Sequence, residues 1–251
     1  MDVHRFLENV QVVNIAGGPG SRLKHRTGDA IPKPLVMING TTLVDIAIEL
    51  YKRNGCNNFV FLLGHLGDKV VDYLKNRRDI ELRYVIEPEK LGKAGALKYG
   101  LDTRTIDRTR PCIVTYPDDL IFDTDFPRKL AEKHLEGLRK GCKATAVRVD
   151  KTRYVYGIVR TDASGVVTGF EEKPWIDCST NVGIYVFEPE IYEIIDRIIN
   201  LDNKPLDIET HLLPYLIDNR LLYAFTIPSE DWIPVNEEKN YQEAEARLAH
   251  K

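Results

Sequence analysis

Short apolar runs alternate with amphipathic stretches along the first half of the chain. The apolar runs have the length of buried β-strands and lie at 10–16, 58–63, 81–86 and 112–116. The stretches between them repeat apolar residues at helical spacing and lie at 41–53, 68–75 and 93–101. A strand–helix alternation of this kind predicts a parallel sheet that is covered by helices on both faces.

The pattern changes from about residue 143. Shorter apolar runs joined by turns predict further strands at 144–149, 157–160, 166–170 and 182–187. Helical periodicity returns at 189–199, 208–217 and 237–249. We therefore expect an α/β fold with a Rossmann-like, mostly parallel or mixed sheet. It forms a single domain over 1–251, with two halves at about 1–142 and about 143–251.

Composition and charge narrow the classes of partner. With 43% hydrophobic residues among 251, the chain can bury a sizeable core. A net charge of −3 argues against nucleic acid as a partner. No apolar run is long enough to cross a membrane, and the N-terminus lacks the apolar segment of a signal peptide, so we expect a cytoplasmic protein. Four dispersed cysteines show no metal-ligand spacing and are expected to be reduced, mostly buried thiols.

The strongest motif is AGGPGSRLKHRTGDAIPKPL at 16–35, directly after the first predicted strand. Its glycines (Gly17, Gly18 and Gly20) allow backbone N–H groups to approach an anion closely. Arg22 adds a bidentate phosphate donor and Lys33 a point charge. The motif is not a Walker A loop, because no Gly-Lys-Ser/Thr follows the glycines, and it does not run directly into a helix as a Rossmann fingerprint does. We interpret it as a polyphosphate-binding loop.

These residues resemble the opening of the sugar-1-phosphate nucleotidyltransferases, which read G-G-x-G-[ST]-R-L and then P-K-P-[LM]. The resemblance continues along nearly the whole chain. It includes EPEKLGKAGAL at 87–97, TYPDD at 115–119, YGIV at 156–159, FEEKP at 170–174 and STNVGIYVF at 179–187. Six motifs in the family's order make the resemblance specific. It implies a nucleotide-diphosphosugar transferase type of fold and the EC 2.7.7 class of enzyme. It also implies a nucleotide-binding half at about 1–142 and a sugar-phosphate-binding half at about 143–251.

The reaction implied by the resemblance joins an NTP to a sugar 1-phosphate, giving an NDP-sugar and pyrophosphate. The sugar phosphate is itself the nucleophile and is largely ionised at pH 7, since its second pKa is about 6. The enzyme then has to supply positive charge and in-line alignment. The resemblance assigns catalysis to Arg22, Lys33 and Lys173. It assigns nucleotide contacts to Ala16, Gly17, Gly18, Gly20, Ser21, Glu87 and Gly92.

The remaining implied roles concern a metal ion and the sugar. Asp118, after the fourth strand, would bind Mg²⁺. Gly157, Glu172 and Asn181 would contact sugar hydroxyls. The second metal carboxylate of the family is replaced, because DWIPVNEEKNY at 231–241 places Asn236 where the glucose-1-phosphate cytidylyltransferases have aspartate. An asparagine still offers a carbonyl oxygen to Mg²⁺ but carries no charge. A homo-oligomer is also expected, as in many family members.

The base is expected to be guanine or cytosine. Glu87 stands where many family members have glutamine, and a carboxylate only accepts hydrogen bonds. Guanine offers two adjacent donors and cytosine its 4-amino group, whereas uracil and thymine present one N–H between two carbonyls. Lys93 stands where the family usually has threonine. The sequence leaves the sugar open, as a hexose or heptose 1-phosphate.

Two other functions stay open. A nucleotide-diphosphosugar glycosyltransferase would share the sheet, and its D-x-D metal motif could correspond to Asp123 and Asp125. A nucleotide-sugar-binding regulator without turnover would use the same pocket, and Asn236 is the feature that supports it.

Overall fold

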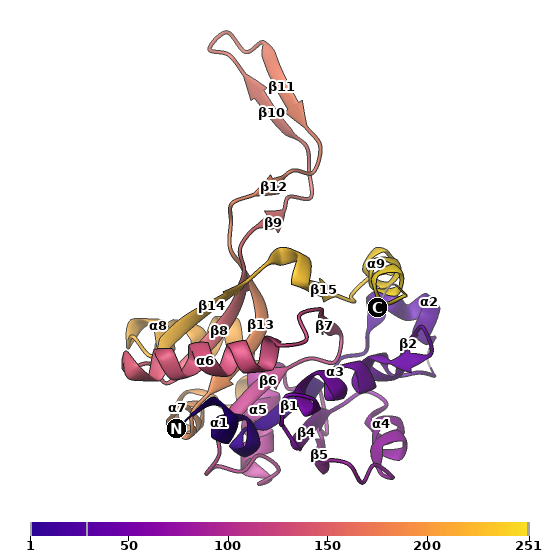
Figure 1. Ribbon diagram of the computed structural model, residues 1–251, viewed down its shortest axis with the longest axis vertical. Coiled ribbons are helices and arrows are strands. Elements are labelled where there is room, and N and C mark those ends of the chain that lie inside the picture. The colour runs from indigo at the N-terminus through magenta and orange to yellow at the C-terminus, as the bar shows by residue number, and fades with distance from the viewer. Residues whose placement is uncertain (1, 29, 250–251) are drawn as a thin grey trace.

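The computed structural model describes residues 2–28 and 30–249. Its centre is a seven-stranded sheet that takes strands from both halves of the chain (Figure 1). From one edge to the other, the strands are β14 (Leu222–Ile227), β8 (Ala144–Val149), β13 (Thr180–Phe187), β6 (Cys112–Thr115), β1 (Gln11–Ala16), β4 (Asn58–Leu63) and β5 (Glu81–Ile86).

The sheet is mostly parallel, as predicted. β1 pairs in parallel with β4 and β6, β4 with β5, and β14 with β8. β13 is the exception and runs antiparallel to β6 and β8. The expected mixed extension in the second half is therefore confirmed, and it arises because one strand reverses direction at the centre of the sheet.

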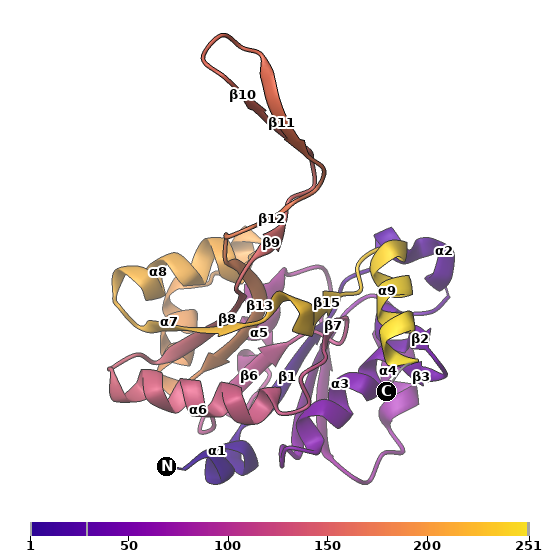
Figure 2. The same cartoon turned by 45° about the horizontal axis from the view of Figure 1, so that its top comes forward.

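Helices cover both faces of the sheet, as Figure 2 shows. One face packs against α1 (Val3–Asn9), α3 (Leu43–Lys52), α4 (Gly67–Leu74) and α6 (Phe126–Arg139). The other face packs against α5 (Lys93–Asp102), α7 (Pro189–Ile198), a π-helical turn (Ile208–Leu212) and α8 (Leu213–Asp218). Neighbouring strand residues serve opposite faces, because side chains alternate along a strand: Val12 belongs to the first core and Val13 to the second.

The apolar pattern predicted most of the longer elements within a few residues of their observed ends, but it missed α1, α6 and β14. α6 was missed although Phe126, Leu130 and Ala131 recur on its buried face at helical spacing. α1 is short, and β14 forms an edge strand with only Phe225 and Ile227 buried. Such edge elements carry weak sequence signals because few of their side chains enter the core.

A smaller third core joins the C-terminus to the loop that follows β1. It is formed by Leu23, Val36, Ile38, Leu43, Leu120, Phe122, Ile233, Val235, Tyr241 and Ala244. Its residues lie in or next to the 3₁₀ turn at Ser21–Leu23, β2 (Met37–Ile38), α3, β7 (Asp119–Ile121), β15 (Trp232–Pro234) and α9 (Glu238–Leu248). The short elements between them in the chain are α2 (Lys24–Thr27), a 3₁₀ turn at Lys33–Leu35 and β3 (Thr41–Thr42). β15 pairs with β7 and thereby brings the segment around Asn236 beside the strand-end aspartates.

A ribbon of residues 152–176, called the arm below, projects from the body (Figures 1 and 2). Its base is the pair β9 (Thr152–Arg153) and β12 (Trp175–Ile176), and its outer part is the antiparallel pair β10 (Ile158–Thr161) and β11 (Val167–Glu171). Most of the side chains of β10 and β11 are exposed. The arm interrupts the chain between β8 and β13 of the central sheet.

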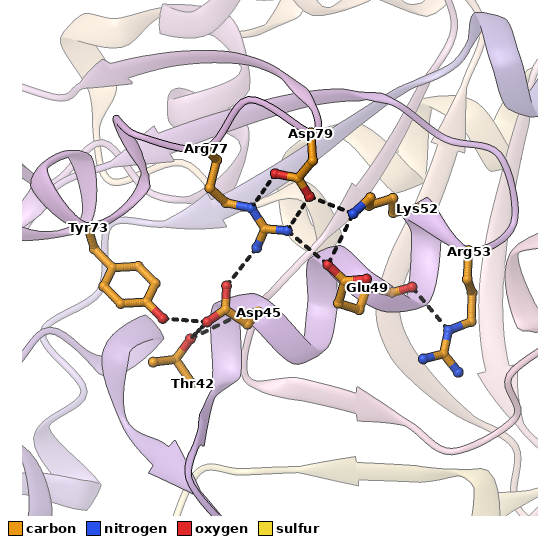
Figure 3. A network of polar contacts seen from close by, with 8 residues as sticks. All are labelled: Thr42, Asp45, Glu49, Lys52, Arg53, Tyr73, Arg77 and Asp79. Atoms are coloured by element: carbon orange, nitrogen blue, oxygen red, sulfur yellow. Dashed lines mark hydrogen bonds and ion pairs between the residues drawn. The ribbon is translucent and has the colours of Figure 1, made fainter.

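An ion-pair network fastens α3 to the segment after α4 (Figure 3). The Arg77 guanidinium donates to Asp45 at 2.7 Å, to Glu49 at 2.8 Å and to Asp79 at 2.7 Å. This hydrogen bonding by Arg77 holds the pKa of the Asp79 carboxyl well below its usual range. Ion pairs at exposed sites contribute about 0–1 kcal/mol each, and the Glu49 and Asp79 side chains are 44% and 40% exposed. The network therefore adds modestly to the stability of the sheet edge near β5.

In the described part of the chain, no helix is long and apolar enough to cross a membrane. All four cysteines are free thiols, as expected. The expectation that most of them are buried is wrong for two: Cys56 and Cys112 are buried, but Cys142 is half-buried and Cys178, next to the arm, is exposed.

Candidate active site

A cavity of about 350 Å³ lies where β1 and β6 end. This is the edge at which parallel α/β sheets bind ligands, because loops leave the strands there. The cavity brings together most of the residues that the motifs predicted for phosphate and metal. Its lining consists of Ile15, Ala16, Gly17, Gly18, Pro19, Gly20, Ser21, Arg22, Lys33, Pro34, Lys90, Lys93, Tyr116, Pro117, Asp118 and Asn236.

Two glycines of the loop, Gly17 and Gly20, occupy positions where a side chain would clash or would strain the backbone. A Cβ atom at Gly17 would lie 2.5 Å from Glu87 Oε1, so a side chain there would displace the glutamate. Gly20 has a φ of +62°, a conformation that favours glycine, and its Cα faces the side chain of Lys33. The loop thus turns sharply and packs its backbone against both Glu87 and Lys33.

Lys33 lies at the centre of the polar contacts in the cavity. Its ammonium contacts the Asp118 carboxylate and donates to Asn236 Oδ1 at 2.8 Å. The Lys33 and Asp118 side chains are only 12% and 24% exposed. Because Asp118 and Asn236 share a cationic partner, their oxygens converge on one point. Two residues separated by more than a hundred positions in the sequence therefore contact the same ammonium group.

Asp119, the neighbour of Asp118, is engaged elsewhere. Its carboxyl accepts a hydrogen bond from Trp232 Nε1 at 3.0 Å. Burial, together with the charge of Asp118, raises the pKa of Asp119 well above its usual value. The two adjacent aspartates thus differ in environment: Asp118 faces the cavity, and Asp119 anchors β15 to β7.

Glu87 lies beside the glycine loop, between Gly17 and Gly64. A Cβ atom at Gly64 would lie 2.7 Å from Glu87 Oε1. Glu87 Oε2 accepts a hydrogen bond from the Leu91 N–H at 3.4 Å. Burial raises the pKa of this carboxyl above its usual value. The glutamate therefore packs against the loop, with Oε1 close to the two glycines, and it is not among the residues that line the cavity.

Gly92 immediately precedes α5, with a φ of +80° and in close contact with the backbone of Leu206. The Leu206 carbonyl accepts hydrogen bonds from Ala94 N–H at 2.8 Å and Gly95 N–H at 3.3 Å. These two amides at the start of α5 are therefore engaged within the protein. Positive charge at this end of the cavity comes from side chains, namely Lys90 and Lys93.

Asn181 lies on β13, in a chain of polar contacts that ends at Lys93. Its Nδ2 donates to the Tyr185 hydroxyl at 2.6 Å, and that hydroxyl donates to Glu209 Oε1 at 3.2 Å. Lys93 Nζ contacts the same Glu209 oxygen at 2.5 Å. Beside this chain, the Tyr116 hydroxyl is buried without a hydrogen-bond partner among the described residues. Burial raises the pKa of Tyr116 far above its usual value.

Three residues of this region, namely Lys90, Tyr116 and Glu209, had no role predicted from the sequence. Lys90 lies within the EPEKLGKAGAL motif and Tyr116 within TYPDD, so their neighbours were a usable signal. No sequence signal pointed to Glu209, because it lies on the π-helical turn, outside every motif.

Gly157, Glu172 and Lys173 lie on the arm and do not line the cavity in the described structure. The Lys173 side chain is 51% exposed, and its Nζ lies 3.7 Å from Glu172 Oε1. A Cβ atom at Gly157 would lie 2.6 Å from the Phe170 ring, so this glycine permits close packing within the arm. The three residues therefore lie near one another but apart from the phosphate loop.

Asp123 and Asp125, which form the D-x-D pattern, lie just before the start of α6. Asp123 Oδ1 accepts a hydrogen bond from Asp125 N–H at 3.0 Å, and Asp123 pairs with Lys129 at 2.7 Å. Asp125 immediately precedes α6. Across residues 2–28 and 30–249, no group of three or more histidine, cysteine or acidic side chains converges as a metal site. The aspartates of this pattern thus serve the helix start, which argues against the glycosyltransferase alternative.

Comparisons with known proteins agree with the fold and the motifs. The nucleotidyl transferase family model matches residues 11–251. Relatives include the mannose-1-phosphate guanyltransferase of Kluyveromyces lactis, 28% identical over 90% of this chain, and the UTP–glucose-1-phosphate uridylyltransferase of Synechocystis, 25% identical over 92%. The chain spans 61% of the length of each of these relatives.

A solved structure shares the fold. It is a Bacillus anthracis protein described as a putative glucose-1-phosphate thymidylyltransferase, in complex with sucrose, and superposes with a TM-score of 0.72. The match covers 95% of this chain and 94% of the other, at 19% sequence identity. Together with the family model, which extends over nearly the whole chain, these findings confirm the resemblance seen in the motifs. The chain belongs to the nucleotidyl transferase family, among the sugar-1-phosphate nucleotidyltransferases.

Proposed function

We propose that the protein transfers a nucleotidyl group from an NTP to a sugar 1-phosphate. The observation that carries this proposal is the cavity itself. A glycine loop, Arg22 and Lys33 line a space at the ends of β1 and β6, and Asp118 and Asn236 contact Lys33 there. Such a site provides charge and shape for two polyanions, which this reaction requires.

The chemistry needs no covalent intermediate. An oxygen of the sugar 1-phosphate attacks the α-phosphorus of the NTP, and the bond from that phosphorus to the bridging oxygen breaks, which releases pyrophosphate. Arg22 and Lys33 are placed to neutralise the charge that accumulates on the leaving pyrophosphate. The loop amides around Gly17 and Gly18 can approach the phosphates because no side chain intervenes.

Mg²⁺ fits the donor set at this site. Mg²⁺ is commonly held by one or two carboxylates together with substrate phosphates, and here Asp118 and Asn236 direct their oxygens to one point, where they share the Lys33 ammonium. We infer that these two residues hold the ion, which would bridge and partly neutralise the phosphates. Because Asn236 is neutral, the protein would supply one negative charge to the metal ion, that of Asp118.

GTP is our proposed donor. Glu87 offers a carboxylate acceptor next to the loop, which suits the paired donors of guanine and opposes uracil and thymine. Several relatives named mannose-1-phosphate guanyltransferases support this choice and make mannose 1-phosphate the first acceptor to test. CTP is the runner-up on the same hydrogen-bonding argument.

Replacing Glu87 by Gln is expected to shift the nucleotide preference towards UTP or dTTP. The amide adds a donor that a pyrimidine carbonyl can accept, while the volume stays nearly the same. The ratio of kcat/KM for GTP to that for UTP should fall about tenfold, a value typical of one hydrogen bond in a binding site. An unchanged profile, with both proteins equally folded, would refute the role of Glu87 in base reading.

The activity is tested by pyrophosphate release with Mg²⁺, using the four NTPs and dTTP against a panel of sugar 1-phosphates. Release that requires both substrates supports the transferase and identifies the preferred pair. Nucleotide binding without release from any pair would favour a nucleotide-sugar-binding regulator, for which Asn236 is the supporting feature. Asn236→Asp would then test whether the missing charge explains the lack of turnover.

We propose that the arm contacts both the sugar phosphate and a second copy of the chain. Lys173, Glu172 and Gly157 would bind the sugar phosphate, together with Asn181 in the body. A two-stranded ribbon in water is marginally stable alone, and side chains such as Phe170 and Val159 are 63% and 55% exposed. Pairing of two arms about a twofold axis would cover these side chains and complete both strand edges.

Sedimentation velocity should therefore find the wild-type protein as a dimer or larger assembly, and Phe170→Ser should shift it towards the monomer. The serine removes apolar area at the centre of the arm and leaves the central sheet untouched. Phe225→Leu, within the body, is the matched control and should keep the wild-type assembly. A wild-type protein that sediments as a monomer would contradict self-association through the arm.

A further inference from the structure

Lys93 occupies an unusual position for a charged side chain. It begins α5, lines the phosphate cavity and contacts Glu209 Oε1 at 2.5 Å. Its side chain is 35% exposed, so a ligand can reach the ammonium. The Ala94 and Gly95 amides of α5 are engaged by the Leu206 carbonyl. A phosphate at this end of the cavity would therefore meet the Lys93 side chain rather than those two helix N–H groups.

Glu209 has a second partner besides Lys93. The Tyr185 hydroxyl donates to the same Oε1 atom at 3.2 Å, and Asn181 in turn donates to that hydroxyl. When Lys93 leaves, Glu209 keeps a hydrogen-bond donor and stays anchored. The carboxylate is 30% exposed, which limits the cost of losing its cation. The ion pair is thus reversible in a way that a fully buried pair is not.

We propose that Lys93 is a further phosphate-binding residue of this cavity and that Glu209 is the competing carboxylate that holds it while no polyanion is bound. Without a polyanion, Glu209 holds the ammonium at the cavity wall. When triphosphate or pyrophosphate enters, Lys93 exchanges the carboxylate for phosphate oxygens. The identity of the polyanion rests on the proposed function. After the exchange, Glu209 keeps its hydrogen bond from the Tyr185 hydroxyl but loses its contact with Lys93. Phosphate binding is thereby linked to β13, where Asn181 lies.

The cavity lining holds four cationic side chains and one carboxylate, that of Asp118, because the position of Asn236 carries no charge. A polyanion in the cavity therefore meets mostly positive charge. Arg22, Lys33 and Lys90 line the same cavity, and Lys93 adds a cation at the end where the helix amides are occupied.

Binding of inorganic pyrophosphate, measured by calorimetry without nucleotide or sugar, tests this proposal directly. Lys93→Met should weaken binding about 10- to 100-fold, the range for loss of one charged hydrogen bond. Lys93→Arg should stay near the wild type because it keeps the charge. Lys98→Met is the matched control: Lys98 lies on the same helix and pairs with Asp102 and Asp196. It should bind pyrophosphate normally.

Glu209→Gln gives a readout that a merely structural role would not produce. Removing the competing carboxylate should tighten pyrophosphate binding about two- to fivefold, as expected for release of a partly exposed ion pair. In the Lys93→Met background, the same change should give no gain. Unchanged binding in Lys93→Met, or equal gains from Glu209→Gln with and without Lys93, would overturn the proposal.

These results are separable from those for the proposed function. Weakened pyrophosphate binding in Lys93→Met supports the role of Lys93 even if no NDP-sugar forms in the substrate panel. Conversely, turnover in the panel together with unaltered pyrophosphate binding in Lys93→Met would leave the function standing and reject the role of Lys93.

Discussion

Replacing Lys33 by Met is expected to lower the rate of pyrophosphate release about 10³-fold. One preorganised donor to developing charge contributes about 10²–10³ in kcat, and a cationic group that acts on phosphoryl transfer contributes about 10³ or more. Lys33 lies between the glycine loop, Asp118 and Asn236, so its loss removes charge at the centre of the cavity. Steady-state kinetics with the preferred substrate pair measures the effect.

The same substitution should also cost stability. An uncharged side chain at this position would leave the Asp118 carboxylate, 24% exposed, without its ammonium partner, and we expect a loss of about 1–2 kcal/mol in the free energy of unfolding. Lys33→Arg keeps the charge but not its compact shape, so it should restore stability more than turnover. If Lys33→Met kept a rate within about tenfold of the wild type, the assignment of Lys33 to the transition state would be wrong.

The sequence predicted the part of the fold that is buried and locally patterned. β1, β4 and β6 read as continuous apolar runs because both of their faces are covered by helices. α6 shows where pattern reading fell short, since its apolar stripe is regular but surrounded by charged residues. The arm is a different case. Its strands were predicted, but their projection from the body depends on long-range geometry that no local pattern encodes.

The residues of the candidate site also fall into those that local sequence patterns predict and those that depend on long-range contacts. Residues that follow strand ends, such as Gly17 and Asp118, were predicted to meet because strand ends in a parallel sheet share one edge. The meeting of Asn236 with them depends on the pairing of β15 with β7, and family motifs supplied that expectation. Glu209 could not be foreseen, because its partnership with Lys93 links two segments that no motif connects.

Replacing Arg22 by Ala is expected to lower turnover about 10²–10³-fold while leaving the fold intact. Arg22 is exposed on the short 3₁₀ turn at Ser21–Leu23, whose anchoring residue is the buried Leu23. Its guanidinium lines the cavity and can bind phosphate in a bidentate manner. Loss of the side chain thus removes a ligand contact and little packing, so the melting temperature should stay close to that of the wild type.

Arg26→Ala is the matched control for that prediction, because Arg26 follows on the same loop but serves the fold. Its guanidinium donates to Glu238 at 2.6 and 2.8 Å and lies 3.6 Å from the centre of the Tyr241 ring. Arg26→Ala should lower the melting temperature and preserve turnover per folded molecule, the reverse of Arg22→Ala. Equal losses of turnover in both variants would mean that the loop tolerates no change of charge, and would remove the case for Arg22 as a specific phosphate ligand.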